Sequence, residues 1–270
     1  MASQQQQHRP RHPIEDASEE SLFGGLSAQQ FYEKQGVVHA EEWMMNARGM
    51  RIFTQRWLPK TSGGGVRVRV RVRGVILALH GFTGDSSWTV QLTCVGLASR
   101  GFAVFALDHQ GHGRSEGLRA SIPDINHVLD DCIQFYTSLI QPTFPAPASP
   151  PCFLYGESLG GALAILLHLR QPHHGIAFSG MLLSGAMCGV SAKFQPAWPL
   201  PTLLRLVARL LPDAPIVPTK PIPHLSFREP WKLRLVLRNP LRVFLRPRPA
   251  TALEILRVAT EIESHLHQVG

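Results

Sequence analysis

The apolar positions of the chain form short runs that alternate with longer segments of helical spacing. Four runs have the length of strands, and the first three of them are apolar at every position, as expected for strands that are covered on both faces. They lie at residues 75–79, 103–107, 152–155 and 180–184. The alternation of these runs with helical segments predicts an α/β fold, in which helices cover both faces of a mostly parallel sheet.

Helical spacing and turn residues place further elements around these runs. Apolar residues at intervals of three and four over residues 125–139 predict one helix, and the Ala/Leu run after residue 160 predicts a buried one. Residues 43–45 and 50–58 flank the turn signal Asn46-Ala47-Arg48-Gly49 and therefore predict a hairpin.

Residues 66–73 alternate valine and arginine, which is the period of a strand with one apolar and one cationic face. The cationic face could bind an anion, or the tract could be a solvated extension of the strand at 75–79. No aromatic residue is interleaved to stack on a base. We therefore interpret the tract as the solvated extension and predict no nucleic-acid partner.

Composition divides the chain into four parts. Residues 1–20 are rich in glutamine, proline and acidic residues and are expected to be disordered. Residues 33–190 hold the predicted α/β core. Residues 191–250 carry 11 Lys and Arg against 2 acidic residues, which accounts for the net charge of +8, and their many prolines predict a cap of short helices. Residues 251–270 are predicted to form the last core helix.

One segment of the cap is amphipathic: residues 203–211 place leucines on one helical face and Arg205 and Arg209 on the other. Such a helix could lie in a membrane interface, roof an apolar pocket or pack on its own domain. A peripheral membrane surface is therefore one partner expected for the basic cap. The N-terminus has no apolar signal segment, and the four separated cysteines lack metal-ligand spacing. These features predict a cytoplasmic protein without a metal or other cofactor.

The segment Gly156-Glu157-Ser158-Leu159-Gly160 follows a predicted strand and precedes a predicted helix. This order is the one that a nucleophile elbow requires, because the serine must stand on a strained turn while the glycines let neighbouring backbone approach. A second match to the Gly-x-Ser-x-Gly pattern, at residues 113–117, lacks both contexts and is interpreted as a loop. Ser158 is therefore the candidate nucleophile; the alternative is a glycine-rich turn with an incidental serine.

Two backbone N–H groups are candidates for binding an oxyanion beside Ser158. The Leu159 N–H lies at the N-terminus of the predicted helix, and the Phe82 N–H lies in a glycine-bearing loop after the strand at 75–79. His112 could serve as a base, but we interpret it as a residue that orders the loop beneath the site. The residues expected to support the site loops are His80, Gly81, His112, Gly156 and Gly160.

Three motifs together resemble the plant monoacylglycerol lipase and caffeoylshikimate esterase family of α/β-hydrolases. They are His80-Gly81-Phe82, the glycine-rich loop at 111–115 and the Ser158 segment, and the cap is similar to that of the family in Ile216-Val217-Pro218-Thr219-Lys220. The resemblance extends from about residue 33 to 269. It implies a serine hydrolase that cleaves an acyl ester of small-molecule type, such as a monoacylglycerol or a lysophospholipid.

The resemblance also implies residues that this sequence does not contain. In the family, the helix that ends near Val269 leads into a strand with the catalytic Asp, and the catalytic His follows later. We therefore assign no acid and no base, and expect the C-terminal strands of the fold to be missing and activity to be low or absent. The alternative function is a non-catalytic, hydrolase-like protein that binds an acyl ligand or a partner.

Overall fold

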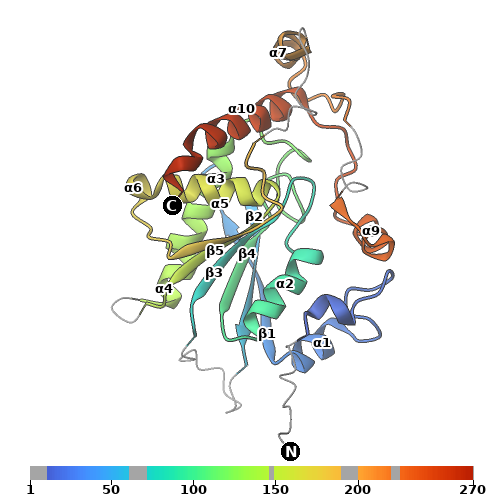
Figure 1. Cartoon of the computed structure of the whole chain (residues 1–270), viewed down its shortest axis with the longest axis vertical. Coiled ribbons are helices and arrows are strands. Elements are labelled where there is room, and N and C mark those ends of the chain that lie inside the picture. Colours follow the sequence, from blue (N-terminus) through green and yellow to red (C-terminus); the bar gives the residue numbers. More distant parts are fainter. Residues whose placement is uncertain (1–10, 61–71, 146–148, 190–199, 220–225, 270) are drawn as a thin grey trace, which may run out of the picture.

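The computed structural model describes residues 11–60, 72–145, 149–189, 200–219 and 226–269. Its centre is a twisted sheet with the strand order β1-β2-β4-β3-β5-β6 (Figure 1). Strands β3 to β6 run parallel, whereas β1 pairs antiparallel with β2 and β2 antiparallel with β4. This confirms the predicted α/β fold with a mostly parallel sheet. The strands are β1 (Val37–Met45), β2 (Arg51–Pro59), β3 (Val75–Leu79), β4 (Ala103–Leu107), β5 (Cys152–Glu157) and β6 (Gly180–Ser184).

Helices cover the sheet on both faces because successive strand residues point to opposite sides. In β3, Leu77 belongs to a core cluster with α3 (Ile125–Phe135), α5 (Leu159–Leu169) and α10 (Pro249–His265). Its neighbour Ile76 belongs to the opposite cluster, with α1 (Ala28–Lys34) and α2 (Thr89–Ala98). The remaining elements are η1 (Pro13–Asp16), η2 (Tyr136–Ile140), α4 (Gln141–Thr143), α6 (Gln171–His174), α7 (Leu200–Leu210), α9 (Pro230–Leu237) and η3 (Leu266–Gln268).

The N-terminal segment corrects one expectation. Residues 11–20 are not disordered, since Pro13 to Asp16 form η1 and the His12 side chain accepts a hydrogen bond from the Ile14 N–H at its start. Pro13 is buried, and Ile14 packs at the margin of the core cluster around α2. Because the composition of this segment is polar, the few residues that pack on the core could not be recognised from the sequence. Residues 1–10 lie outside the described residues.

The predicted hairpin is confirmed, and its turn is tied to a helix across the molecule. Strands β1 and β2 pair along nine residues each, and the turn closes with an Asn46 N–H to Met50 carbonyl bond of 2.9 Å. Arg48 reaches from this turn to the buried Asp131 on α3, at 2.6 Å. Most of the valine–arginine tract lies outside the described residues, so its interpretation stays a prediction.

The two described helices of the segment predicted to form a cap differ in their contacts. Helix α7 stands at the periphery beyond α10, and its Leu206 and Leu210 are 54% and 71% exposed (Figure 1). Helix α9 lies beside the N-terminal segment, with Leu235 buried in the same core cluster as α2. No helix in the described part of the chain has the length and apolar character needed to cross a membrane.

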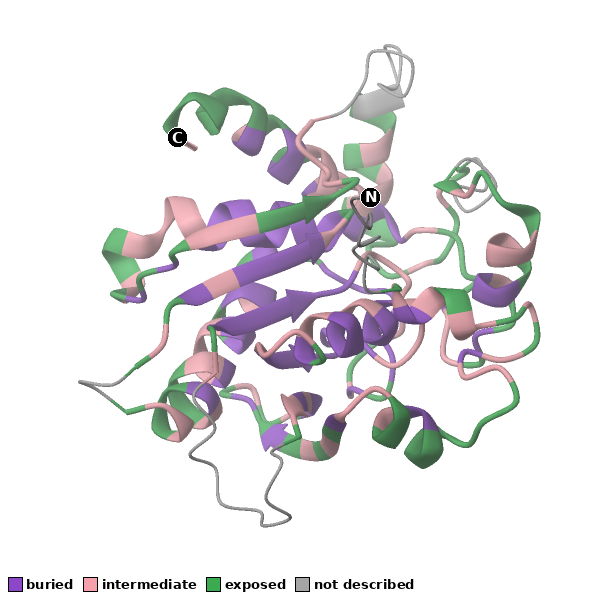
Figure 2. Cartoon of the chain, turned by 60° about the horizontal axis from the view of Figure 1, so that its bottom comes forward, coloured by how far each residue is buried: buried purple, intermediate pink, exposed green. Residues whose placement is uncertain are grey.

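Strand β6 is the edge of the sheet on the side of α5. Figure 2 shows buried central strands and a more exposed β6, in which Leu182 and Leu183 are 46% and 41% exposed. Among the described residues, β6 pairs with β5 only. Strand β6 is therefore an edge of the sheet in the described part of the fold.

Candidate active site

Ser158 stands in a backbone conformation that residues with side chains rarely adopt. Its φ is 54° and its ψ is −116°, at the junction between β5 and α5. Such a conformation costs about 1–3 kcal/mol and persists only where surrounding contacts fix it. The Ser158 N–H donates to the Ser184 carbonyl at 3.1 Å, and its own carbonyl accepts from the N–H groups of Gly161 and Met187 at 3.0 Å each. The turn therefore has the strand–strained serine–helix geometry of a nucleophile elbow.

The glycines of this turn are required by close backbone approaches. A Cβ on Gly160 would lie 2.1 Å from the Leu79 carbonyl oxygen, and one on Gly156 would lie 2.3 Å from the Gly160 carbonyl oxygen. Both neighbours are backbone atoms, which cannot move aside without shifting β3 or α5. The absence of side chains at these two positions lets α5 begin directly against the end of β3.

The loop that follows β3 lies against the Ser158 side chain. A Cβ on Gly81 would lie 3.2 Å from the Ser158 Cβ and 3.9 Å from its Oγ. Leu159 begins α5, so its N–H points out of the helix end with the positive end of the helix dipole. No described residue accepts a hydrogen bond from the N–H of Phe82 or Leu159. The structure thus brings the predicted residues together, and their roles remain predictions.

Three buried histidines support this loop. The His80 Nδ1 donates to the Gly81 carbonyl at 2.8 Å, because that oxygen can only accept, and the His80 Nε2 accepts from the His109 N–H at 3.0 Å. The His109 ring stacks on the His80 ring at 3.9 Å between centroids, and its Nε2 donates to the His80 carbonyl. The His112 ring meets the Phe82 ring edge-on at 5.5 Å. These contacts fix both backbone and side chains around the Phe82 N–H.

Burial keeps all three imidazoles neutral. It lowers the pKa of His80 well below its usual value, that of His109 to about 3 and that of His112 to about 4. The His112 Nδ1 donates to the Gln110 carbonyl, and its buried Nε2 has no partner among the described residues. A group with so low a pKa is a weak proton acceptor at neutral pH. This supports the interpretation of His112 as a residue that orders the loop.

A residue that the sequence reasoning missed, Asp108, holds the two site loops together. It directly follows β4, and its carboxylate accepts from the Ser86 N–H at 2.7 Å, the Ser86 hydroxyl at 2.6 Å and the Arg114 N–H at 2.9 Å. Burial, and next the nearby Asp85, raise the pKa of Asp108 to about 6. An acidic residue immediately after a central strand was the available signal, since ligands gather at that edge of such sheets.

The second Gly-x-Ser-x-Gly match is a loop, as predicted. The Ser115 hydroxyl donates to the Asp108 carbonyl at 2.6 Å and accepts from the Phe53 N–H at 2.9 Å. Ser115 is buried and its backbone is not at positive φ. Its hydroxyl is therefore fully used in joining the loop to β2.

Comparison with known proteins identifies the family. The family described as serine aminopeptidase S33 matches residues 70–270. The chain belongs to this family. This S33 chain is 26% identical to caffeoylshikimate esterase from Arabidopsis thaliana, over 92% of the chain and 71% of that protein. It is 34% identical to human monoglyceride lipase over 52% of the chain, a match that spans only 41% of the lipase.

Solved structures agree with the fold of the S33 chain. A monoglyceride lipase from Saccharomyces cerevisiae aligns with a TM-score of 0.65 at 20% identity, over 83% of this chain and 69% of that one. A carboxyl esterase from Bacillus coagulans aligns with a TM-score of 0.60 at 19% identity, over 83% of this chain and 73% of that one. The predicted α/β-hydrolase fold and the predicted family resemblance are both confirmed.

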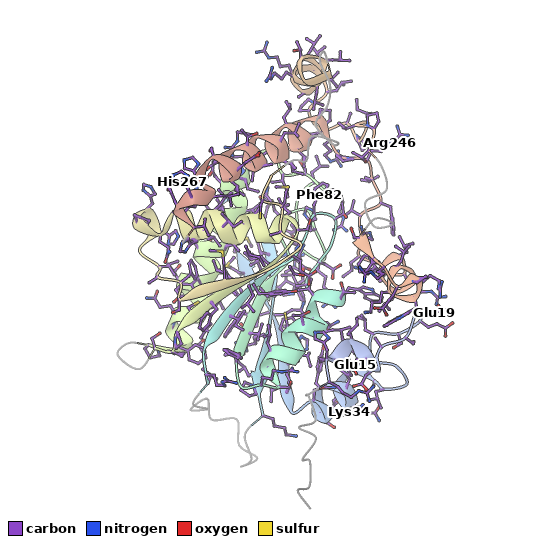
Figure 3. All side chains as sticks on the ribbon, in the orientation of Figure 1. Glu15, Glu19, Lys34, Phe82, Arg246 and His267 are labelled. Carbon is purple, nitrogen blue, oxygen red and sulfur yellow. The ribbon has the colours of Figure 1, made fainter. Side chains whose placement is uncertain are left out.

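Several acidic and histidine residues that follow Ser158 in this S33 chain have other contacts. Glu254 accepts from the Ile125 N–H at the start of α3, and Glu261 pairs with Arg170. The His265 ring bonds the Glu261 carbonyl on the surface of α10, and His267 lies at the far end of that helix from Phe82 (Figure 3). Across the described ranges, no imidazole or carboxylate hydrogen-bonds the Ser158 hydroxyl. His224 lies outside those ranges.

Replacing Gly160 by alanine should destabilise the S33 chain by about 3 kcal/mol, because the new methyl group must displace backbone of β3. Urea unfolding followed by circular dichroism measures the loss. Gly25→Ala is the matched control, since a Cβ there meets nothing within 4 Å. Equal stabilities for the two variants would contradict the close approach.

Replacing His112 by asparagine should weaken the acid sensitivity of folding. The folded pKa of His112 is about 4 against 6.5 for the ordinary group, so the unfolded chain binds a proton that the folded chain excludes as the pH falls from 6.5 to 4. Stability is lost over that window, by about 3 kcal/mol for this one group. Asparagine keeps a donor for the Gln110 carbonyl and removes the titration.

Urea unfolding at pH 6.5 and pH 4 checks this, because the raised pKa of Asp108 acts in the opposite direction in both chains and cancels in the comparison. The exposed His267→Asn serves as the control. An unchanged pH dependence in His112→Asn would show that His112 does not remain neutral on folding.

Proposed function

We propose that the chain hydrolyses carboxylic esters, with Ser158 as the nucleophile and the N–H groups of Phe82 and Leu159 as oxyanion donors. The observation that carries the proposal is the strained Ser158 backbone, at φ 54°, with the Gly81 loop against its side chain. Strain of this kind is retained where function requires it. A serine hydroxyl that lies beside a loop and a helix N-terminus, each with an N–H group from which no described residue accepts a hydrogen bond, is suited to acyl transfer.

In the proposed reaction the Ser158 Oγ attacks the ester carbonyl carbon while a base takes the hydroxyl proton. The carbonyl oxygen gains the negative charge and is stabilised by the Phe82 and Leu159 N–H groups. Collapse of this intermediate breaks the ester C–O bond, and the base returns its proton to the leaving oxygen, so that the alcohol departs and an acyl-serine remains. Water then attacks the acyl carbon in the same way, which releases the carboxylic acid and restores the Ser158 hydroxyl. The base remains unassigned, since none of the described histidines contacts the Ser158 hydroxyl.

We further propose a monoacylglycerol or lysophospholipid as the substrate. Relatives that carry the names monoglyceride lipase and caffeoylshikimate esterase support an acyl ester of a small alcohol. The exposed leucines of α7 would offer an apolar surface for an acyl chain or for the lipid layer that holds it. The basic residues Arg205 and Arg209 on the same helix would favour an anionic surface.

A second candidate function is binding without catalysis, of an acyl ligand or a protein partner. The observation in its favour is that the Ser158 hydroxyl has no described base. An unactivated serine is a weak nucleophile near neutral pH. Reactivity of Ser158 toward a mechanism-based probe therefore separates the two functions.

If the proposal is right, a fluorophosphonate probe will label Ser158. Mass spectrometry of the labelled peptide identifies the site, and Ser158→Ala should abolish labelling, whereas Ser115→Ala should keep it because that hydroxyl is bonded on both sides. Turnover of p-nitrophenyl butyrate should fall in parallel by at least about 10³-fold in Ser158→Ala. A folded chain that is neither labelled nor active would favour the binding function.

We also expect the chain to bind vesicles of mixed phosphatidylcholine and phosphatidylserine through α7. Leu206→Glu should weaken co-sedimentation about tenfold, since burying one leucine side chain in lipid contributes about 1.5 kcal/mol or more. Raising the salt concentration should weaken it further by screening the arginines. Val38→Glu, at a similarly exposed apolar residue on β1 (45% against 54% for Leu206), is the control. Equal binding by the two variants would exclude α7 as the contact.

A further inference from the structure

Part of the cap is fastened to the loop that carries the Phe82 N–H. Three hydrogen bonds join residues 235–243 to this 80–88 loop. The Trp88 Nε1 donates to the Leu235 carbonyl at 2.8 Å, the Asn239 Nδ2 donates to the Asp85 carboxylate at 2.6 Å, and the Val243 N–H donates to the Thr83 carbonyl at 3.2 Å. The loop is thus held from outside the sheet by a segment far away in the sequence.

The loop needs this support because its backbone is not in a relaxed conformation. Thr83, which directly follows Phe82, has a φ of 64°, in the left-handed region that favours glycine. A β-branched residue there returns to extended backbone when the bonds that hold it are lost. The Val243 bond to its carbonyl and the Asp85 contact two residues later are the restraints on the cap side.

Asn239 is buried in this junction, 5% exposed, and both ends of its amide are used. Its Oδ1 accepts from the Leu241 N–H at 2.9 Å, which leaves the Nδ2 to face Asp85. The reverse orientation would set an oxygen against the carboxylate and an NH₂ group against an N–H. A residue held so firmly can transmit the position of the cap to the loop.

Asp85 lies between the cap and a second buried carboxylate. Its Oδ1 accepts from the Ser87 N–H at 2.8 Å, and Asp108 binds the intervening Ser86 from the sheet side. Burial raises the pKa of Asp85 despite the Asn239 bond. The other charged groups that act on Asp85 are Asp108, Arg114, Arg119 and Arg242.

The cap segment is itself anchored at its other end. Leu235 is fully buried, and Trp231 packs beside it against the core cluster that contains Leu22 and Phe31. Arg234 pairs with Glu19 of the N-terminal segment, which Figure 3 shows beside α9. Asn239 therefore projects from a fixed support two residues beyond α9.

We propose that Asn239 is a positioning residue that, through Asp85, holds the Phe82 N–H in place beside Ser158. The catalytic consequence of this proposal rests on the proposed function. The mechanical part, in which Asn239 restrains the 80–88 loop, is a property of the folded chain whether or not it turns over esters. Loss of the bond frees the loop at Thr83 and moves an oxyanion donor away from the reacting carbonyl.

Hydrogen exchange of the peptide that spans 80–88 tests the restraint without any substrate. In Asn239→Ala this peptide should exchange about tenfold faster than in the unmodified chain, while the hairpin of β1 and β2 stays unchanged. Arg246→Ala, an exposed residue of the same cap segment, should leave both peptides unchanged. Unchanged exchange of the 80–88 peptide in Asn239→Ala overturns the proposal.

Asn239→Asp provides a test within one folded sample. At pH 8 two ionised carboxylates would face each other and open the loop, whereas at pH 5 a shared proton would restore the hydrogen bond. At pH 8 the 80–88 peptide of Asn239→Asp should exchange about tenfold faster than that of the unmodified chain, whereas at pH 5 the two rates should be about equal. A ratio that does not depend on pH overturns the contact, even if Asn239→Ala fails to fold.

Kinetics with p-nitrophenyl butyrate tests the catalytic consequence. Asn239→Ala should lower kcat about tenfold and leave KM unchanged, less than the 10²- to 10³-fold that loss of a whole donor causes. An unchanged kcat with a raised KM would overturn the positioning role. If the unmodified chain shows no turnover, the proposed function fails, and the exchange measurements still decide the restraint.

Discussion

The strained conformation of Ser158 is the constraint on which this structure depends. It is held by three strands at once: β5 leads into it, the Ser184 carbonyl of β6 receives its N–H, and the end of β3 packs on Gly160. Because these contacts involve backbone atoms, the position of the hydroxyl is set by the register of the sheet. The strained geometry of Ser158 is therefore a consequence of the fold, and a change in the strand pairing would alter the backbone at this one residue.

The loops beside the serine are supported by buried groups whose pKa values are shifted by burial. Neutral imidazoles suit this support because each can donate from one nitrogen and accept at the other, as His80 does. The Asp108 carboxylate, by contrast, only accepts hydrogen bonds, and its donors come from two loops. Burial raises its pKa to about 6. The combination orders the loops without placing a full positive charge near Ser158.

Much of the fold and of the Ser158 turn could be predicted from short-range patterns in the sequence. The strands β3 to β5, the hairpin and the elbow follow from apolar runs, turn residues and a glycine-flanked serine, all of which act over a few neighbouring residues. The pairing of Asn239 with Asp85 spans 154 positions, and no periodicity reports it. The order of residues 11–20 was not predicted for another reason. A few side chains pack on the core and order this segment, although its overall composition is polar.

The segment that we predict to be a cap is leucine-rich and basic in sequence, but its two described helices differ in burial. In α9 the apolar residues Leu235 and Val236 are buried, so they contribute to the stability of the fold and fix the segment that reaches Asp85. In α7 the apolar residues Leu206 and Leu210 face outward and contribute little to that stability. The same substitution, leucine to a charged residue, should therefore unfold the molecule in one half and alter only its surface in the other. The two roles that we propose, lipid contact through α7 and positioning of the loop through Asn239, are compatible within one short segment because burial separates the residues concerned.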